Sequence, residues 1–447
     1  MKKQGVVVVG SALIVVAVGG SIILSMLGGE GDAMRVVTVG RSPLALAIDT
    51  RSGHIFVANY NDGRPPGTVS MLDATDGALR RTIPVGMFPR GVVVDEQRTR
   101  AFVMDTAAPS SSAKAGVSVI DTRSGQLRQQ LPFNTTPTLL DIDPTAGRVF
   151  VGLPRGVGPF TSPPTGQIQT LDTTTGRRVR TVFLNFVPRA SAVDERRGRL
   201  FLVGTGRGGV GYLAMLDTRN GRMLETTAVG VAPSVVAVDT QQDHVFVGDL
   251  GRPTSACAAP SGSCKMISTV SMLDARNGHV LRTVGVGQNP LSMVIDQYTH
   301  RVFAVNRGNN QGDRGTVSVL DSRSGRVLQT NTVGESPLGA AVDIRHSHVY
   351  VANGNSGTVS IIDARNGRFL GNLRVAEGPL AVAVDERTDR VFVSSADVSD
   401  SIPMAYRPDR GIFDVIGYLG NALVRQARVL RKGRTGTVSM FDTRTVP

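Results

Sequence analysis

Tryptophan is absent from this 447-residue sequence, cysteine occurs only twice, and aromatic residues make up 5% of the chain. The lack of tryptophan excludes repeat families whose signature contains that residue. No Ser-His-Asp set, haem-attachment motif, phosphate-binding loop or dinucleotide-binding fingerprint occurs in a suitable context. We therefore expect no catalytic residues and no cofactor.

The two cysteines, Cys257 and Cys264, lie close together in a segment rich in Gly, Pro and Ser. No histidine lies near them in the sequence, so they do not predict a zinc site. In an oxidising compartment, such a pair predicts a local disulfide. We expect this bond and no metal.

Long charge-free stretches are also lacking, with one exception near the N-terminus. Residues 5–29 carry no charge and follow Lys2 and Lys3. This run exceeds the roughly 20 residues that cross a hydrocarbon core, and the two lysines favour a cytoplasmic N-terminus. Because we find no A-x-A-like cleavage site, we predict a retained signal-anchor over residues 1–29 and a linker over 30–34. A cleaved signal is the alternative, and in both cases the rest of the chain is predicted to be exported to the periplasm or the cell exterior.

Acidic residues are outnumbered by basic ones. The chain has 49 Lys and Arg against 36 Asp and Glu, so its net charge is +13, and most of the basic residues are arginine. A basic surface predicts anionic partners and does not constrain the fold.

The sequence contains an internal repeat. A "TVSxxD"-like phrase and a "PxxxxxD" phrase alternate along the chain, eight times each. The aspartates of the first phrase are Asp73, Asp121, Asp172, Asp217, Asp274, Asp321, Asp363 and Asp442. Those of the second are Asp49, Asp95, Asp143, Asp194, Asp239, Asp296, Asp343 and Asp385. Such regular recurrence predicts a repeat architecture.

Each repeat unit contains four short segments rich in Val, Ile, Leu and Thr, which is typical of half-buried strands. The D-x-x-x-G turn suits a short hairpin, because the aspartate bonds to the backbone and glycine adopts the left-handed conformation. Four antiparallel strands in each unit predict one blade of a β-propeller. We therefore predict an all-β fold, an eight-bladed β-propeller over residues 35–447.

The ends of the chain predict how the ring closes. Residues 437–442 repeat the first strand of a unit and have no successors, whereas residues 35–59 supply three strands of a unit that lacks its first. An open ring would expose strand edges. We therefore expect the C-terminal strand to pair with the N-terminal three strands.

The segment "VYVANGNSGTVSIIDARNG" at residues 349–367 resembles the YVTN-repeat (YncE-like) family of extracytoplasmic β-propellers. The resemblance covers about residues 35–393 and the last strand, through "YVAN" at 350–353 and the recurring "VGxxP" and "TVSxxD" phrases. It implies a propeller and export. The family is functionally mixed, so the resemblance implies little about activity.

Residues that recur in every unit are predicted to be structural. The repeat aspartates are expected to stabilise turns. A basic residue precedes the last strand of every unit, so His346 and His348 are not expected to bind a metal. The recurring aromatic residues of that strand, which we expect in the core, are Phe56, Phe102, Phe150, Phe201, Phe246, Phe303, Tyr350 and Phe392.

Differences between units concentrate in the connections at one end of the strands, which we call the loop face. The opposite end, the turn face, carries the D-x-x-x-G turns and both ends of the ring. Function on a repeat scaffold is usually located where the units differ. The candidate binding residues of the loop face are Arg41, Arg64, Phe88, Arg90, Arg155, Phe160, Arg189, Arg207, Arg252 and Arg307. Arginines beside aromatic rings predict binding of phosphates, carboxylates or bases; the alternative is a surface neutralised by Arg–Asp pairs.

The longest connection, residues 394–436, has helical periodicity. Its apolar stripe and basic end are formed by Ile412, Ile416, Leu419, Leu423, Arg425 and Arg428. This pattern predicts an amphipathic helix inserted into the β scaffold. The helix would act as a lid over the ring or as a surface for a partner.

Together these observations favour a monomeric, membrane-anchored propeller that acts as a non-catalytic binding or scaffolding module, with an envelope protein or an anionic polymer as its partner. One alternative is binding of polyanions or single-stranded nucleic acid through the loop face. Another is a metal-dependent enzyme resembling propeller lactonases or lyases. Its oxygen ligands would be the strand-end residues Asn59, Asp105, Asp249, Asn306 and Asn353.

Overall fold

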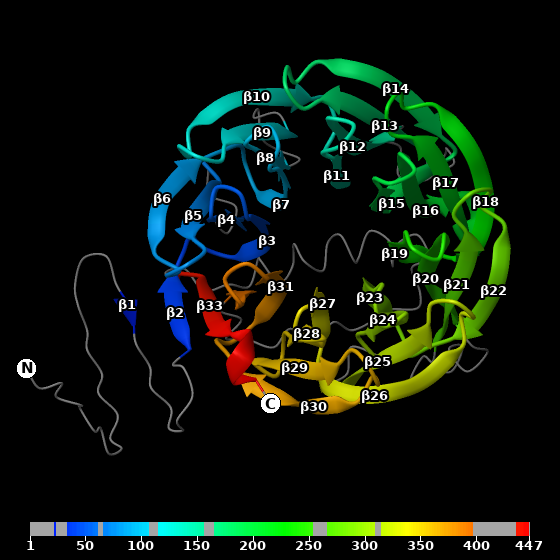
Figure 1. The fold of residues 1–447 in the computed structure, drawn as a ribbon. Helices are drawn as coiled ribbons and strands as arrows, with labels where there is room; N and C mark the ends of the chain where they lie inside the picture. The colour runs from blue at the N-terminus through cyan, green and yellow to red at the C-terminus, as the bar shows by residue number, and fades with distance from the viewer. Residues whose placement is uncertain are drawn as a thin grey trace, which may run out of the picture.

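The computed structural model describes residues 22–23, 34–60, 66–106, 115–155, 165–253, 266–308, 314–396 and 435–446. Over these ranges the chain forms 33 β-strands and two short 3-10 turns, η2 (Arg207–Gly209) and η4 (Thr443–Thr445), and it contains no α-helix. The strands form eight antiparallel sheets arranged as a ring (Figure 1). The predicted eight-bladed β-propeller is confirmed.

Each blade has four strands, which follow one another from the inner strand at the ring axis to the outer strand at the rim. Blade 1 contains β3 (Pro43–Asp49), β4 (His54–Asn59), β5 (Thr68–Asp73) and β6 (Leu79–Pro84). Blade 2 contains β7 (Pro89–Asp95), β8 (Arg100–Asp105), β9 (Ala115–Asp121) and β10 (Leu127–Phe133). Blade 3 contains β11 (Leu139–Asp143), β12 (Arg148–Arg155), β13 (Thr165–Asp172) and β14 (Arg178–Leu184). Blade 4 contains β15 (Phe186–Asp194), β16 (Arg199–Gly206), β17 (Val210–Asp217) and β18 (Met223–Val231).

The second half of the ring has the same plan. Blade 5 contains β19 (Pro233–Asp239), β20 (His244–Pro253), β21 (Met266–Asp274) and β22 (Val280–Gly285). Blade 6 contains β23 (Pro290–Asp296), β24 (Arg301–Asn306), β25 (Arg314–Asp321) and β26 (Val327–Glu335). Blade 7 contains β27 (Pro337–Asp343), β28 (His348–Asn353), β29 (Thr358–Asp363) and β30 (Phe369–Arg374). Blade 8 contains β31 (Pro379–Asp385), β32 (Arg390–Ser395), β33 (Thr437–Asp442) and, as its outer strand, β2 (Arg35–Thr38).

Closure of the ring joins the two ends of the chain in blade 8. The C-terminal β33 pairs with β32 on one side and with the N-terminal β2 on the other, from Arg35 opposite Met440 to Thr38 opposite Thr437. The predicted closure by N- and C-terminal strands is confirmed, but only the first of the three N-terminal strands takes part. The next two, β3 and β4, belong to blade 1. The reason is that residues 39–42 cross between blades, with the positive φ of 50° at Ser42 that Phe88 also has in the crossing from blade 1 to blade 2.

One short strand lies in the segment predicted to be the signal-anchor. Residues Ile22–Ile23 form β1, which pairs with Val36 and Val37 of β2. Apart from these two residues, the predicted anchor lies outside the described residues. No helix in the described part of the chain is long and apolar enough to cross a membrane. The predicted helix within 394–436 also lies outside the described residues, which end at 396 and resume at 435.

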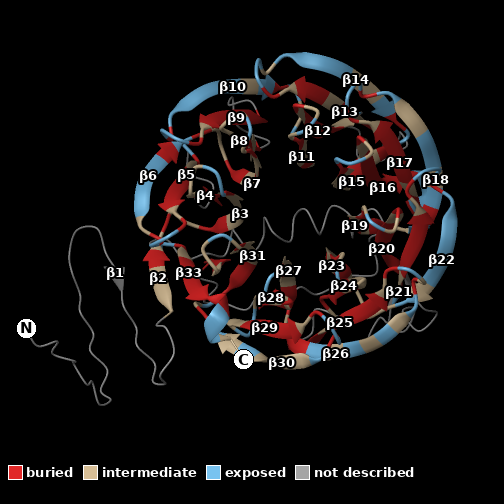
Figure 2. Cartoon of the chain, viewed as in Figure 1, coloured by how far each residue is buried: buried red, intermediate tan, exposed pale blue. Residues whose placement is uncertain are grey.

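The core lies between neighbouring blades. The eight recurring aromatic residues, predicted on the last strand of each sequence unit, lie on the second strand of each blade counted from the ring axis. All eight are fully buried, with 0% exposure, so their predicted core role is confirmed. Figure 2 shows the second and third strands mostly buried and the outer strands mostly exposed, as the patterns of β4 and β6 illustrate. Buried aromatic side chains of this size each stabilise a fold by about 3–5 kcal/mol relative to alanine.

The repeat aspartates build the turns, as predicted. Each of the sixteen accepts a backbone N–H bond from a residue two or three positions later. Asp49, for example, accepts bonds of 3.0 Å from both Arg51 and Ser52. Such a bond replaces the solvation that the turn amides lose.

Three histidines of the turn face make structural contacts. His54 Nδ1 lies 2.9 Å from the Thr122 carbonyl of blade 2, and His244 Nδ1 lies 2.8 Å from the Ser322 carbonyl of blade 6. His346 Nδ1 lies 2.9 Å from Asp343 Oδ2. These contacts link a turn to its own aspartate or to the next blade.

Candidate functional site

Thirteen arginines of the turn face are paired with acids. They form ion pairs with aspartates, most of which are repeat aspartates, and the longest of these contacts is 3.7 Å. The paired arginines are Arg80, Arg98, Arg128, Arg148, Arg196, Arg197, Arg199, Arg276, Arg301, Arg345, Arg387, Arg390 and Arg444. Pairing acts on the acids as well, since the hydrogen bond from Arg444 helps to lower the pKa of Asp442 to about 2.

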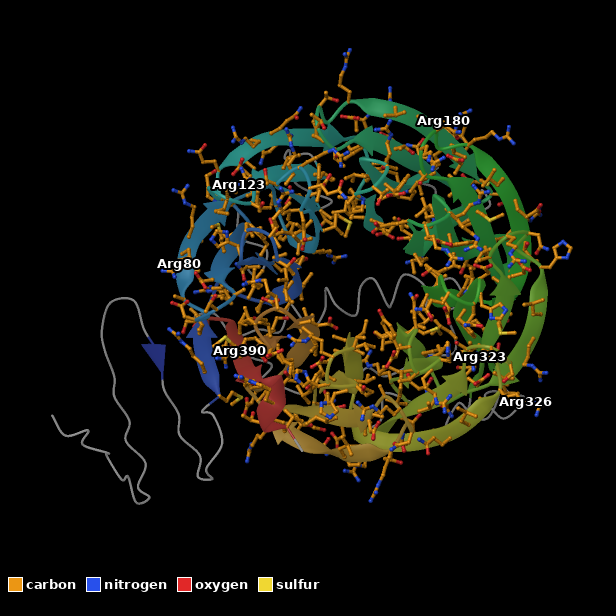
Figure 3. All side chains as sticks on the ribbon, in the orientation of Figure 1. Arg80, Arg123, Arg180, Arg323, Arg326 and Arg390 are labelled. Atoms are coloured by element: carbon orange, nitrogen blue, oxygen red, sulfur yellow. The ribbon has the colours of Figure 1, made fainter. Side chains whose placement is uncertain are left out.

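Some arginines on the outer rim are not paired in this way. Arg123, Arg323 and Arg326 are exposed in or beside the turns before the outer strands, and Figure 3 labels them on the rim of the ring. They form no ion pair with a described acid. They offer matched controls for the loop face.

On the loop face, Arg90 lies in an aromatic environment. Its guanidinium carbon is 5.5 Å from the centre of the Tyr60 ring, and this ring lies 5.0 Å from that of Phe88. Arg90 Nε is buried and has no hydrogen-bond partner in the described part of the chain. Tyr60, Phe88 and Arg90 therefore form one cluster at the boundary of blades 1 and 2. A cation over an aromatic face contributes about 0.5–2 kcal/mol.

Arg155 forms a second and separate arginine–aromatic pair. Its guanidinium carbon is 4.2 Å from the centre of the Phe183 ring. Phe183 lies on the outer strand β14 and is 61% exposed, and Arg155 is exposed as well. The structure therefore keeps Arg155 apart from the Arg90 cluster. Phe183 was not among the sequence candidates, because its position on an outer strand carried no signal.

Arg189 is a half-buried cation on the inner strand β15. Burial lowers the pKa of its guanidinium to about 10. Its Nε is buried without a hydrogen-bond partner, and no described acid pairs with it. A desolvated charge without a partner is unfavourable, so this side chain has a free-energy reason to accept an anion.

The remaining candidates differ in their surroundings. Arg207 is exposed in the turn η2. A further loop-face arginine outside the candidate set, Arg314 at the start of β25, is exposed too. Arg307 is only 8% exposed, and its Nε donates to Ser336 Oγ at 3.0 Å, so it stabilises the loop. Arg41 is half-buried. The backbone of Arg252 pairs with Ile267.

Several candidates cannot be placed. Their positions, or for Arg252 the side chain, lie outside the described residues. They are Arg64, Phe160, Arg252, Cys257, Cys264, Ile412, Ile416, Leu419, Leu423, Arg425 and Arg428.

The five strand-end residues considered as metal ligands have a different role. Asn59 Nδ2 donates to Ser70 Oγ at 3.0 Å in its own blade, and Asn306 and Asn353 make the same bond in theirs. In blade 2, Ser118 Oγ instead donates to Asp105 Oδ2 at 2.5 Å. In blade 5, Thr269 Oγ1 donates to Asp249 Oδ2 at 2.5 Å.

Each strand-end side chain also packs closely against a glycine at the crossing from the preceding blade. A Cβ atom on Gly40 would lie 2.6 Å from Asn59 Cγ, and one on Gly86 would lie 2.5 Å from Asp105 Cγ. The five residues belong to five separate blades and do not converge. Within the described residues, no three His, Cys, Asp or Glu side chains gather as a metal site. This geometry gives no support to a metal-dependent enzyme at these residues.

Burial distinguishes the two acids from the three amides at this position. It raises the pKa of Asp105 to about 7, although the hydrogen bond from Ser118 acts in the opposite direction. Burial likewise raises the pKa of Asp249 to about 6, against the bond from Thr269. Burial thus makes both carboxyl groups easier to protonate in the fold than in the unfolded chain.

Comparisons with known proteins identify the fold and no more. No family model matches the chain, and no curated protein matches it. Among solved structures, Saccharomyces cerevisiae Sqt1 is 11% identical, with a TM-score of 0.62 over 92% of this chain and 98% of that one. The Dos1 propeller is 12% identical, with a TM-score of 0.59 over 91% and 93%, and BamB from Moraxella catarrhalis is 14% identical, with a TM-score of 0.55 over 91% and 99%. The YVTN-repeat resemblance therefore stays a prediction, and what the structural neighbours show is that this chain is a β-propeller.

Proposed function

We propose that this propeller is a non-catalytic binding module that takes an anionic polymer on its loop face. The observation that carries the proposal is the difference in pairing between the two faces. Thirteen turn-face arginines are paired with aspartates, whereas the loop-face arginines Arg90, Arg155, Arg189, Arg207 and Arg314 form no ion pair with a described acid. Unpaired guanidinium groups beside aromatic rings are suited to phosphate or carboxylate groups and to stacked bases.

The test compares two triple variants of the full chain that lose the same charge. One is R155Q/R207Q/R314Q on the loop face, and the control is R123Q/R323Q/R326Q on the rim. All six side chains are exposed, so folding should be preserved. Binding of labelled single-stranded DNA and of an acidic polysaccharide is measured across a salt series.

The expected result is binding that weakens steeply with salt. If the three loop-face arginines contact phosphates, their loss reduces the slope of log K against log salt by about 2 for single-stranded DNA, while the rim variant retains the wild-type slope. Stronger binding of DNA than of polysaccharide at equal charge would assign a role to ring stacking. Absence of binding at low salt, or equal losses in both triple variants, would refute the proposal.

The proposed module is exported and held at a membrane by residues 5–29. The uncharged run after Lys2 and Lys3 supports this location. Since β2 starts beside Met440 at the turn-face end of β33, a membrane anchor would enter at the turn face and leave the loop face pointing outward.

The anchor is tested by alkaline extraction of membranes from cells that produce the full chain. The wild type should stay in the membrane fraction. V15D/V16D, which places two charges in the apolar run, should be released or fail to insert. Release of the wild type together with the variant would refute the anchor and would leave β1 free to pair with β2.

A further inference from the structure

One register position divides the centre of the ring into two chemically different arcs. It is the residue that follows the proline at the loop-face end of each inner strand. In blades 6, 7, 8 and 1 this residue is Leu291, Leu338, Leu380 and Leu44. In blades 2 to 5 it is Arg90, Thr138, Arg189 and Ser234. Because successive blades are neighbours in the ring (Figure 1), four leucines form one continuous arc and four polar residues form the other.

The local backbone at this position departs from regular strand pairing. In seven of the eight blades the pairing of the inner strand with the second strand shifts register just after the proline, as between Pro89 and Gly91 or between Pro188 and Ala190. A register shift of this type leaves a residue out of the ladder and redirects its side chain, and such shifts are frequent beside binding sites. The position is therefore free to differ between blades without disturbing the sheets.

Two members of the polar arc are engaged in the scaffold. Thr138 Oγ1 donates to the carbonyl of Pro188 at 2.7 Å, and Ser234 Oγ donates to that of Pro290 at 2.5 Å. Each of these bonds ties a blade to the next. This leaves Arg90 and Arg189 as the arc's two charged groups, and the Nε of each is buried without a partner among the described residues.

Three leucines of the arc supply apolar surface, since Leu44, Leu291 and Leu338 are partly exposed. Leu44 also packs against the Tyr60–Phe88 pair. Leu380 is buried, at 9% exposure, and supports the arc from within the fold. Between the proline and the closing aspartate of each inner strand, the only acid is Asp141 on β11. Its Oδ1 accepts the Ile142 N–H at 2.8 Å, and its carboxylate also hydrogen-bonds to Ser191.

We propose that the loop-face end of the ring axis binds an amphiphilic anion, whose carboxylate or phosphate group meets Arg90 and Arg189 and whose hydrocarbon part packs on the leucine arc. The inference rests on the proposed function, because it treats the loop face as the binding face. It adds a ligand class and a position. A guanidinium group recognises both carboxylate and phosphate through paired N–H bonds, and each methylene that is buried strengthens binding by about fourfold.

The test titrates the full chain, held in amphipol, with octanoate and with octyl phosphate by calorimetry. Octyltrimethylammonium carries the tail of octyl phosphate with the opposite charge, and acetate and inorganic phosphate carry the head groups alone. The wild type should bind the two octyl anions. It should bind the head groups much more weakly, and the cation not at all. The ratio of octanoate to octyl phosphate affinity decides which head group the site prefers.

Three variants locate the site. R90Q/R189Q should lower the affinity for octanoate at least about tenfold, and R123Q/R323Q should leave it within about twofold. L291A should lower octanoate affinity by about fourfold or more without changing acetate binding. If R90Q/R189Q does not fold, R90K/R189K, which retains the charges and loses the paired geometry, should still weaken binding.

The outcomes separate this inference from the proposed function. R155Q/R207Q/R314Q should lose the polymer and keep octanoate. Octanoate binding that R90Q/R189Q leaves unchanged, or equal binding of the octyl anions and the octyl cation, would overturn the inference while leaving the polymer result intact.

Discussion

The strand β12 runs from the turn face to the loop face, and the arginines at its two ends have opposite surroundings. At the turn face, Arg148 Nη1 lies 2.8 Å from Asp172 Oδ2 of the adjacent strand. At the loop face, Arg155 lies over the Phe183 ring and has no acid partner among the described residues. Arg148 occupies a position that is Arg or His in every blade as part of the repeat. Arg155 lies at the start of a connection that differs from blade to blade. One strand thus separates the scaffold chemistry from the chemistry that is available to a partner.

The largest expected effect concerns the scaffold, where the ring closes. Deleting residues 436–447 removes β33, and with it the buried side chains of Val438, Met440 and Phe441. The loss of three such side chains costs about 6–15 kcal/mol, which is similar to the whole stability of a typical domain, and β2 and β32 would be left with open edges. Thermal unfolding should show no cooperative transition, or one at a much lower temperature.

Removal of Pro447 alone serves as the control for this deletion and should leave the transition unchanged. A chain without β33 that melts at the wild-type temperature would show that the ring does not depend on closure through blade 8.

An intermediate effect is expected where blades 1 and 2 differ at one equivalent position. Asn59 and Asp105 occupy the same site, but the pKa of Asp105 is raised to about 7 by burial, from an ordinary value of 3.8. Between these values the unfolded chain releases the proton and the folded chain keeps it, so the contribution to stability is complete below about pH 4 and is lost as the pH rises towards 7. Asp105→Asn should therefore stabilise the protein by roughly 2 kcal/mol or more above pH 7 and change little near pH 4.

The reciprocal variant Asn59→Asp is the matched control, because Ser70 can bond to a carboxyl group there as Ser118 does in blade 2. It should introduce the same loss of stability with rising pH. Chemical denaturation of both variants across this pH range measures the effect. Parallel curves for Asp105→Asn and the wild type would refute the assigned pKa.

Most of the scaffold could be predicted from the sequence alone. The blade count, the turn aspartates and the buried aromatic residues follow from local patterns that recur eight times, so each unit supports the interpretation of the others. The partner of β33 was predicted less completely, because which N-terminal strands join blade 8 depends on the crossing turn at 39–42, whose conformation is set by packing between blades.

The loop face was harder to predict for a related physical reason. Arg307 and Arg155 look alike as isolated arginines in variable connections. The first is buried against Ser336, and the second is exposed over Phe183. Burial and pairing depend on contacts between segments far apart in the sequence, and a single chain contains no repeated pattern that reports them at positions where the blades differ.

The smallest expected effect tests the comparison of the two ends of β12 directly. Arg148→Gln breaks a partly exposed ion pair, so it should destabilise the fold by about 0.2–1 kcal/mol, and less at high salt. Arg155→Gln removes an exposed side chain whose only described partner is the Phe183 ring, so it should cost at most about 0.5–1 kcal/mol of folding free energy and yet weaken binding of an anionic polymer. Denaturant melts at two salt concentrations measure the free energy of unfolding, and one titration per variant measures polymer binding. Arg148→Gln should change mainly the first quantity and Arg155→Gln mainly the second. If Arg148→Gln weakened polymer binding as much as Arg155→Gln, the two faces would not be functionally distinct, and the assignment of the loop face would have to be abandoned.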